Sequence, residues 1–397
     1  MHALPRYVVG CMTGTSLDAI DTALVRIEGE GLGMTAAFVH GSTHSLGALR
    51  DSLRAIAQQE PMTAGAIASV ARDFSLLHAD AVKELLATVP SGDGKREFGE
   101  PTLICVHGQT VFHQPPVSWQ LFEPWPMAHA LKVPVVHNLR QADLAAGGQG
   151  APITPLADVI LYGREEESVC AVNLGGFINF TCIPRCDASV FASSKSIDEQ
   201  KRLQVRRTHQ AGALRGADVC ACNQLLDGVA RVMLREAYDK DGQAALSGAV
   251  HEEALEDLEG VLRAQAHSKR SLGTGDELIE CINRWRHRVS GADLARTACE
   301  AIAGTLAERI RALDTQPDKL VLAGGGVYNR ALVNAIRANC TAEVVTSDAM
   351  GIPSAYREAA CFAVLGALAQ DGIAITLSQV TKRNASHTGR DGVWVYP

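Results

Sequence analysis

The chain has 397 residues, 47 % of them hydrophobic and 20 % charged, a composition typical of a compact soluble protein with two or three domains. Its net charge of −7 gives no electrostatic reason to expect a nucleic acid partner. No apolar run of about 18 residues predicts a membrane span, and residues 1–6 are not typical of a secretory signal. The 11 cysteines follow no disulfide-scaffold spacing, so we expect reduced thiols and a cytoplasmic protein.

The first hundred residues predict three strands followed by two helices. Apolar, β-branched runs indicate strands over 7–12, 20–28 and 34–40. Helical spacing covers 47–59 and 61–89, with Pro61 in a first helical turn. Further elements are expected in chain order as strands over 102–106 and 133–137 and a helix over 154–162.

The turn between the first two strands carries the most informative chemistry. Gly14 lets backbone N–H groups approach a ligand, and the hydroxyls of Thr15 and Ser16 can donate to phosphate oxygens. Asp18 can hold Mg²⁺, directly or through water. The residues predict a phosphate loop at the tip of a β-hairpin, but not a Walker loop, whose Gly-x-x-x-x-Gly-Lys-[Ser/Thr] string is absent. An ordinary polar hairpin turn is the alternative.

A second hairpin with a glycine turn follows in the middle of the chain. Strands over 169–173 and 177–181 flank residues 174–176, which repeats the layout of strand, glycine turn and strand. Two halves that open in this way predict an α/β fold with an N-terminal lobe, 1–163, and a C-terminal lobe, 164–397, around a central cleft. Ligands of such folds usually bind between the lobes.

The C-terminal lobe is predicted to be rich in helices. Weak apolar periodicity with serine and basic clusters marks 185–215 as a long surface loop or a disordered insert. The other elements are helices over 223–238, 250–266, 276–287, 291–312, 328–339 and 354–370 and strands over 319–323 and 342–346.

Three glycine segments together predict an ATP site. The first two would approach phosphate from the two lobes, and the third joins a strand to a helix whose N–H groups can donate to a nucleotide. Each alone is equally well explained as a structural turn, but their order along the chain favours a two-lobed ATPase. The segments are Gly14 to Asp18; Asn173, Gly175 and Gly176; and Gly324, Gly325, Gly326 and Asn329.

Polar side chains that follow two strands predict contacts to a sugar or nucleotide. His107 and Gln109 come after the strand over 102–106, at a strand end where ligands bind. A satisfied loop histidine is the alternative. Arg140, Asp143 and Gln149 lie beside a glycine turn and can read carbohydrate hydroxyls, whereas a surface Arg–Asp ion pair is the simpler interpretation of the two charges.

Asp218 is a candidate general base just before the helix predicted from residue 223. A helix cap is an equally common use of aspartate at such a place. Cys182, Cys186, Cys220 and Cys222 are weighed as metal ligands, but their spacings are not those of zinc sites.

Further segments complete a pattern that runs over nearly the whole chain. They are Asp21, Asp158, Asn179, the run from Glu358 to Ala363, Thr388 with Gly389, and the run from Val395 to Pro397. Together with the segments above, they resemble the anhydro-N-acetylmuramic acid kinase family.

The resemblance implies an actin-like, sugar-kinase-type ATPase fold that uses ATP and Mg²⁺. Such kinases open the 1,6-anhydro bridge of the sugar with water and phosphorylate O6. The product would be N-acetylmuramic acid 6-phosphate, an intermediate of peptidoglycan recycling. Asp218 would activate the water as a general base, and Mg²⁺ and the loop donors would stabilise the transferring phosphoryl group. Glu358 would join the substrate-binding residues.

The catalytic segment departs from the family pattern. The family reads Asp-Thr-Gly-Pro-(Gly/Ala)-Asn, whereas this chain reads Asp218-Val219-Cys220-Ala221-Cys222-Asn223, with Asp227 again matching. The loss of glycine restricts the loop's conformations. Three functions stay open: a kinase for anhydro-N-acetylmuramic acid, a kinase for another 1,6-anhydro-sugar such as levoglucosan, and a nucleotide- or sugar-binding protein of low turnover. A homodimer is the default expectation for the quaternary structure.

Overall fold

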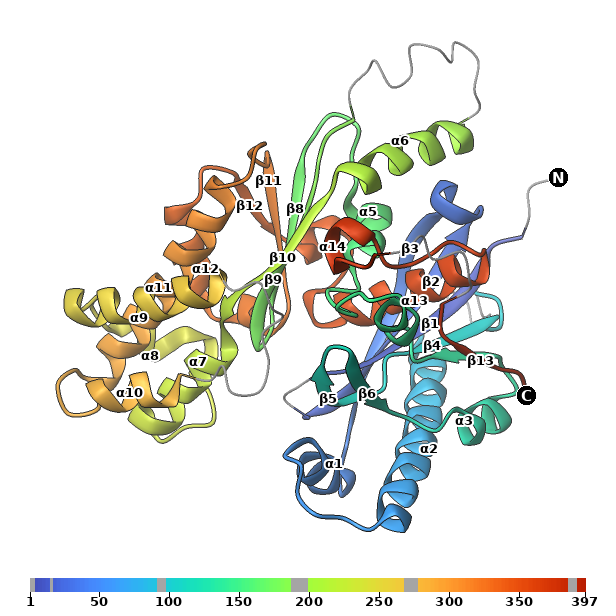
Figure 1. The fold of residues 1–397 in the computed structure, drawn as a ribbon, viewed down its shortest axis with the longest axis horizontal. Coiled ribbons are helices and arrows are strands. Elements are labelled where there is room, and N and C mark those ends of the chain that lie inside the picture. Colours follow the sequence, from blue (N-terminus) through green and yellow to red (C-terminus); the bar gives the residue numbers. More distant parts are fainter. Residues whose placement is uncertain (1–3, 15–16, 91–97, 187–198, 268–277, 385–390) are drawn as a thin grey trace. The chain divides into compact units, whose positions relative to one another are not determined.

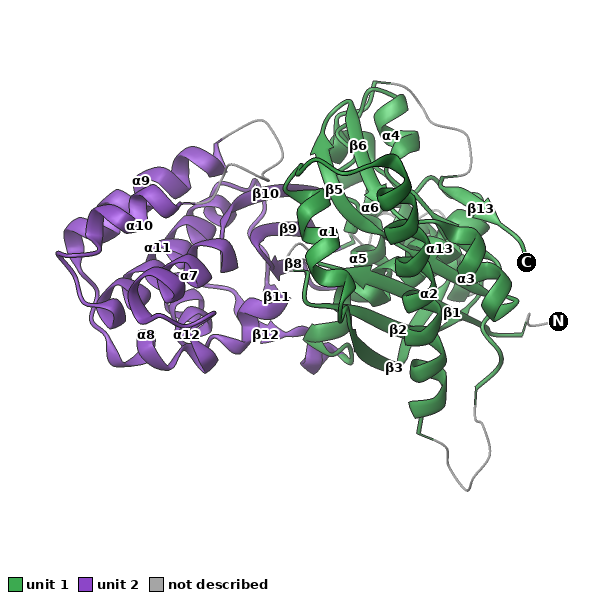
Figure 2. Ribbon diagram, turned by 90° about the horizontal axis from the view of Figure 1, so that it is seen from below, with its two compact units in different colours: residues 1–163, 186–213, 351–397 green, residues 164–185, 214–350 purple. Residues whose placement is uncertain are grey.

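The computed structural model describes residues 4–14, 17–90, 98–186, 199–267, 278–384 and 391–397. The chain forms two compact units, coloured green and purple in Figure 2. Unit 1 comprises residues 1–163, 186–213 and 351–397, and unit 2 comprises residues 164–185 and 214–350. The chain leaves unit 1 after residue 163, where the sequence predicts a lobe boundary. It then returns to unit 1 twice, with two segments that the predicted C-terminal lobe, 164–397, had included.

Unit 1 is built on a six-stranded sheet (Figure 1). Its strands in spatial order are β13 (Val393–Val395), β7 (Val135–His137), β4 (Leu103–Val106), β1 (Arg6–Thr13), β2 (Ala19–Glu28) and β3 (Thr35–Ser45). The pairs β1–β2 and β2–β3 are antiparallel, whereas β4 pairs parallel with both β1 and β7. The predicted N-terminal hairpin is therefore confirmed. A separate antiparallel pair, β5 (Gln109–Gln114) and β6 (Val117–Leu121), has no counterpart in the predicted elements.

The helices of unit 1 come from all three of its chain segments. They are α1 (Leu49–Ala57), α2 (Ala64–Thr88), α3 (Pro124–Leu131), α4 (Gln141–Ala145), α5 (Pro155–Tyr162), α6 (Glu199–Ala213), α13 (Arg357–Gln370) and α14 (Ser378–Thr381). Helix α2 begins after Thr63, whose hydroxyl accepts a hydrogen bond from the Ala66 N–H at 3.2 Å. Pro61 therefore precedes the helix instead of lying in its first turn.

Strand β1 contacts different helices with its two faces, because successive side chains of a strand point to opposite sides. Val9 belongs to the same buried cluster as Phe74 of α2. Gly10 faces α13, where an added Cβ would collide with the Ala359 carbonyl oxygen and lie 2.5 Å from the Ala363 nitrogen. The backbone of α13 thus lies directly against the backbone of β1.

The segment predicted as a loop or disordered insert contains α6, so that prediction is wrong for residues 199–213. This helix has little apolar periodicity, and a buried cation holds it in place. Arg207 is 4 % exposed, and its guanidinium donates to the carbonyl oxygens of Met34 and, at 2.9 Å, of Ile160. Residues 187–198 of the same segment lie outside the described residues.

Unit 2 repeats the arrangement around β1. Its five-stranded sheet has the order β10 (Arg215–Ala221), β9 (Phe177–Ile183), β8 (Val169–Leu174), β11 (Lys319–Ala323) and β12 (Glu343–Thr346). Strand β8 pairs antiparallel with β9 and parallel with β11, just as β1 pairs with β2 and β4. The second predicted hairpin and the α/β class are confirmed, and both strand orders agree with the actin-like ATPase fold that the resemblance implies.

Helices pack on the sheet of unit 2 and bury its main hydrophobic core. They are α7 (Asn223–Val229), α8 (Gln243–Ser247), α9 (Glu252–Ala266), α10 (Ile279–Trp285), α11 (Gly291–Arg311) and α12 (Arg330–Asn339). The helix predicted over 223–238 ends as an α-helix at Val229 and continues as one π-helical stretch, Ala230–Leu234. Arg235 then takes a left-handed conformation, with φ of 61°, which stops the helix. Within the described residues, no helix reaches the length and hydropathy that a membrane crossing requires.

Replacing Gly10 by alanine tests the contact between β1 and α13. We expect Gly10→Ala to lower the free energy of unfolding by about 1–3 kcal/mol, because the added methyl group overlaps the backbone of α13. Gly65→Ala is the control: Gly65 is exposed in α2, a Cβ there meets nothing within 4 Å, and a change within about 0.5 kcal/mol is expected. Chemical denaturation followed by circular dichroism measures both, and equal values for the two variants would contradict the packing described.

Candidate active site

The turn of the first hairpin lies in unit 1, between β1 and β2. The Leu17 N–H donates to the Gly14 carbonyl oxygen at 3.2 Å, and Leu17 has a positive φ of 55°, which closes a tight turn. Thr15 and Ser16 lie outside the described residues, as do Thr388 and Gly389 near the C-terminus. Asp18 is exposed directly before β2, and its carboxylate forms an ion pair with Arg50 at 2.5 Å.

The second and third glycine segments meet in unit 2. Gly324 has a φ of 84°, and a Cβ there would lie 2.6 Å from Asn173 Oδ1 and 2.9 Å from the Leu174 carbonyl oxygen. At Gly326, a Cβ would lie 2.7 Å from the Leu174 Cβ. The absence of side chains therefore lets the strand end of β11 lie against the turn of the β8–β9 hairpin.

Asn223 joins these two segments to the start of α7. Its Nδ2 donates to the Leu174 carbonyl oxygen at 3.0 Å, and its backbone N–H donates to the Gly175 carbonyl oxygen at 3.1 Å. The Cys222 N–H donates to the Gly176 carbonyl oxygen at 2.9 Å. Asn173 Oδ1 is buried and has no hydrogen-bond partner among the described residues. Unit 2 thus brings the second and third glycine segments into one cluster, and the Asn173 side-chain oxygen stays available to a ligand.

Asn329 has a structural role that the sequence pattern did not indicate. The chain passes from Gly325 to Tyr328 through a 3-10 turn and then enters α12. The Asn329 side-chain oxygen accepts the Leu332 N–H at 3.0 Å and so caps this helix. The N-terminus of α12 therefore follows the glycine segment, as predicted, while the carboxamide oxygen of Asn329 is already used by the helix.

Asp218 lies within β10, opposite Asn179 of β9, and is partly buried. It is not a helix cap, because Cys222 occupies the cap position of α7. The pairing register shifts between Asp218 and Ala221, so a bulge separates the aspartate from the last strand residue. The position of Asp218 in space is therefore set by the pairing of β10 with β9 before it and by the start of α7 after it.

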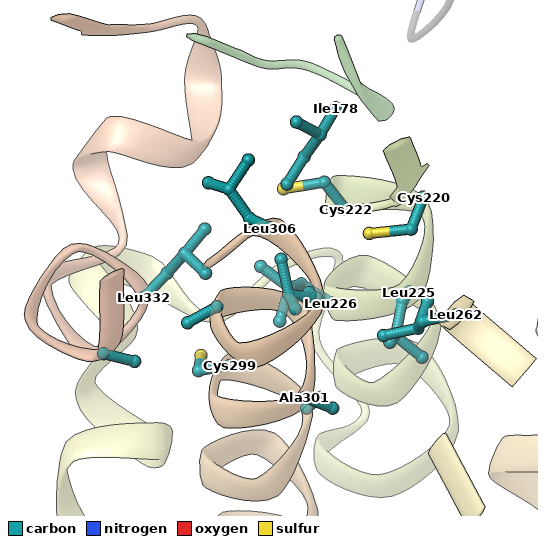
Figure 3. Close-up of a cluster of buried hydrophobic side chains, with 14 of the residues drawn as sticks. Ile178, Cys220, Cys222, Leu225, Leu226, Leu262, Cys299, Ala301, Leu306 and Leu332 are labelled. Atoms are coloured by element: carbon teal, nitrogen blue, oxygen red, sulfur yellow. The ribbon is translucent and has the colours of Figure 1, made fainter. Parts of the chain in front are cut away.

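The four residues that depart from the family pattern after Asp218 form part of the hydrophobic core. Val219, Cys220, Ala221 and Cys222 are fully buried, and Figure 3 shows the two cysteines among apolar side chains that include Ile178 and Leu225. Burial raises the pKa of both thiols, which stay neutral. The Ala221 N–H donates to Gln265 Oε1 at 2.9 Å, a bond that a proline at this position could not make.

One of the four cysteines weighed as metal ligands is bonded to another cysteine. Cys182 is joined to Cys170 by a disulfide across the β8–β9 hairpin, where the two residues face each other. The expectation of reduced thiols is therefore wrong for this pair, because direct cross-strand neighbours lie close enough to bond. Among the described residues, no group of three His, Cys, Asp or Glu side chains is arranged to hold a metal ion.

The predicted sugar-contacting residues of unit 1 form a connected network. His107 follows β4, and its Nε2 accepts hydrogen bonds from Arg140 Nε at 3.2 Å and Nη2 at 2.9 Å. Arg140 Nη1 donates to the Gly150 carbonyl oxygen at 2.6 Å. Burial, and then the Arg140 cation, hold the pKa of His107 well below its usual range, so the imidazole is neutral. His107 Nδ1 and Gln109 Oε1 are buried without a partner among the described residues.

Asp143 closes the loop that carries the other two predicted residues. It is fully buried: Oδ2 accepts the Gly150 N–H at 2.8 Å, and Oδ1 accepts the Thr381 hydroxyl at 2.6 Å. The Gln149 N–H donates to the Thr381 carbonyl oxygen at 2.8 Å. Thr381 belongs to the far end of the sequence, so no local pattern could have indicated its part in this loop.

Glu358 lies in the first turn of α13 and is partly buried. Burial raises the pKa of its carboxyl group, and the nearby Asp21 acts in the same direction. Arg357 and Arg140 oppose this shift. Glu358 is therefore electrostatically coupled to the Arg140–His107 network, although it is far from both residues in sequence.

Comparison with known proteins gives a match over nearly the whole chain. The family model described as anhydro-N-acetylmuramic acid kinase matches residues 6–193 and 207–392. The anhydro-N-acetylmuramic acid kinase of a Synechocystis species is 31 % identical over 385 residues, which cover 90 % of this chain and 91 % of that protein. The corresponding protein of Synechococcus elongatus is 29 % identical over 389 residues, covering 94 % and 96 %.

Solved structures show weaker likenesses. Component A of (R)-2-hydroxyglutaryl-CoA dehydratase from Acidaminococcus fermentans has a TM-score of 0.41 at 13 % identity, covering 91 % of this chain and 98 % of that chain. A ROK family glucokinase from Streptomyces griseus, in complex with glucose and AMPPNP, has a TM-score of 0.37 at 15 % identity, covering 91 % and 99 %. These likenesses carry no functional weight. The family match, which includes residues of both units, shows that the chain belongs to the anhydro-N-acetylmuramic acid kinase family.

Proposed function

We propose that this chain is the ATP-dependent kinase that opens the 1,6-anhydro ring of anhydro-N-acetylmuramic acid with water and phosphorylates O6. The product is N-acetylmuramic acid 6-phosphate. The observation that carries the proposal is the family match, which extends through residues of both units. A panel of anhydro-sugars that includes levoglucosan, assayed with ATP and Mg²⁺ for sugar-dependent ADP release, tests it. Turnover of levoglucosan alone would contradict the proposed substrate.

The glycine segments supply the ATP-binding part of the proposal. The first hairpin turn, Gly14 to Asp18, would bind phosphate from unit 1. In unit 2, the cluster of Asn173, Gly175, Gly176 and Gly324 to Gly326 offers close backbone approach and the unpartnered Asn173 Oδ1. The N-terminus of α12 adds backbone N–H donors beside that cluster. That Gly14, Gly175 and Gly325 bind the same nucleotide stays a prediction.

Asp18 is the residue proposed to support Mg²⁺. Mg²⁺ is usually bound by one or two carboxylates together with phosphate oxygens and water. An exposed carboxylate beside a phosphate turn fits this requirement, and the described residues contain no larger ligand cluster that would hold the ion without a nucleotide. When bound, the ion would neutralise charge on the transferring phosphoryl group.

The sugar-side proposal rests on the network around Arg140. The Nδ1 atom of the neutral His107 and the buried Gln109 Oε1 have no hydrogen-bond partner in the part of the chain that the structure describes, as expected for groups that bind hydroxyls. Arg140, Gln149 and Glu358 complete the proposed set. Asp143 contributes indirectly, because both of its carboxylate oxygens hold the loop.

Asp218 is proposed as the general base that activates the water for attack on the anhydro carbon. Its neighbours Val219 to Cys222 differ from the family, but they are well packed as buried core residues. This supports a remodelled loop around a functional aspartate. The use of ATP supports a cytoplasmic location, and a homodimer stays a prediction.

Removing the Asp18 charge tests the Mg²⁺ proposal. We expect Asp18→Asn to reduce turnover by about 10²-fold or more, the usual effect of losing an electrostatic group at a reacting centre. Arg50→Gln is the matched control, because it breaks the same ion pair but leaves the carboxylate. Steady-state kinetics over a range of Mg²⁺ concentrations measures both. Near-normal turnover of Asp18→Asn at saturating Mg²⁺ would refute the assignment.

Removing the Asp143 carboxylate tests the sugar loop. Because two hydrogen bonds to a charged group are lost, and each is worth about 1.5–3 kcal/mol, we expect Asp143→Ala to raise the KM for the anhydro-sugar at least tenfold. The KM for ATP should stay nearly unchanged. Thr381→Val removes one of the two bonds and should show a smaller effect of the same kind. An equal rise in both KM values would make the loop merely structural.

The Asp218→Asn variant tests whether Asp218 acts as the general base or contributes only to binding. Loss of a general base lowers turnover by about 10²–10⁴-fold, while nucleotide binding, measured by calorimetry, should be retained. Asp241→Asn, which removes an exposed charge from the same unit, is the control and should behave as wild type. If Asp218→Asn turns over at the wild-type rate, another residue is the base. If the wild type binds ATP but turns over no anhydro-sugar, the chain is a nucleotide- or sugar-binding protein of low turnover.

A further inference from the structure

A buried ion pair lies beside the proposed substrate residue Glu358. Arg357, the first residue of α13, is 2 % exposed, and Asp158 of α5 is fully buried. Arg357 Nη2 donates to Asp158 Oδ1, and the Cys361 thiol lies 3.8 Å from the same oxygen. Both charges lie inside unit 1, where removal from water is costly.

The first turn of α13 is held on other sides as well. Gly10 of β1 lies against the Ala359 carbonyl oxygen with no room for a Cβ. A Cβ at Gly41 of β3 would collide with the ring of Tyr356, which precedes the helix and stacks on Phe38. Packing therefore also holds the backbone here. An apolar pair in place of the two charges would hold the helix at a lower desolvation cost, so the ionic character of the pair needs another reason.

That reason is the charge around Glu358. The charged groups that act on its carboxyl come from four places: Arg357 on its own helix, Asp21 on β2, Arg140 before α4, and Asp158 on α5. Burial and the two aspartates raise the pKa of Glu358, whereas the two arginines lower it. An unpaired Arg357 cation next to Glu358 in sequence would shift this balance strongly toward the ionised carboxylate.

We propose that Asp158 and Arg357 are positioning residues for Glu358: the pair anchors the first turn of α13 and offsets most of the Arg357 charge, which keeps the Glu358 carboxyl ready to exchange a proton. The inference rests on the proposed function in so far as Glu358 contacts the sugar. It gives no direct contact with substrate to either partner of the pair.

The test compares Asp158→Asn, Arg357→Met and the double variant with wild type. Two titrations are recorded: the pH dependence of kcat/KM for the anhydro-sugar, and the infrared band of the Glu358 carboxyl group, identified by its loss in Glu358→Gln. Asp158→Asn should lower the titration midpoint by about one pH unit or more, because the Arg357 cation is no longer offset. Arg357→Met should raise the midpoint. The double variant, which buries no unpaired charge, should fall between them.

Asp371→Asn is the matched control at the other end of α13. Asp371 follows the last turn and pairs with Arg6 at 2.6 Å, so its loss should lower the melting temperature without moving the Glu358 midpoint. If the Asp158 and Arg357 variants also change only the melting temperature, the pair is structural and the inference is overturned. Should one single variant fail to fold, the other single variant decides: a midpoint unmoved relative to both wild type and Asp371→Asn overturns the inference.

Failure of the proposed function gives a different result. A wild-type protein that phosphorylates no anhydro-sugar removes the kinetic titration but leaves the infrared titration, which needs no substrate. Opposite midpoint shifts in Asp158→Asn and Arg357→Met would then still support the charge balance at Glu358.

Discussion

The contact between the backbones of β1 and α13 is the constraint around which unit 1 is arranged. Gly10 admits no side chain there, and Gly366 in the same helix lies against Cys105 of β4 in a similar way, with 2.7 Å between an added Cβ and the Cys105 Cβ. Since β1 leads directly into the first glycine turn and Glu358 lies in the first turn of α13, one close approach fixes the place of both. The proposed phosphate and sugar residues of this unit therefore share a rigid support.

The sequence predicted elements marked by apolar strands and glycine turns and missed elements that lack such a pattern. Alternating apolar residues and glycine turns were sufficient for both hairpins, since a hairpin is formed by neighbouring residues. Helix α6 could not be predicted because its anchor, Arg207, bonds to Met34, 173 residues away. The pair β5–β6 is rich in polar residues, such as Gln109 and His113, so an apolar pattern gives no signal for it.

The types of residue in the sequence were sufficient to choose candidate site residues, but not to tell what each residue does in the fold. His107, Arg140 and Glu358 were chosen as candidates from their types and from family resemblance, and the structure places them in one electrostatic network. The functions of Asp143 and Asn329 inside the fold could not, because a carboxylate that closes a loop and an amide that caps a helix look like ligand groups in a sequence. Their partners, Gly150 and Leu332, bond through backbone N–H groups, which every residue other than proline carries.

Unit 1 is built from three separate segments of the chain, and this has a consequence for how the protein folds during synthesis. Residues 214–350 of unit 2 leave the ribosome before residues 351–397, which unit 1 needs for α13. The ion pair between Arg6 and Asp371, which lie 365 residues apart, can therefore form only late in synthesis. The same holds for the pair between Asp158 and Arg357, which lie 199 residues apart. Contacts of such separation are slow to form because long loops must close first. During synthesis, the face of β1 around Gly10 stays uncovered until α13 has been made, so unit 1 is completed only after the residues of unit 2 have been synthesised.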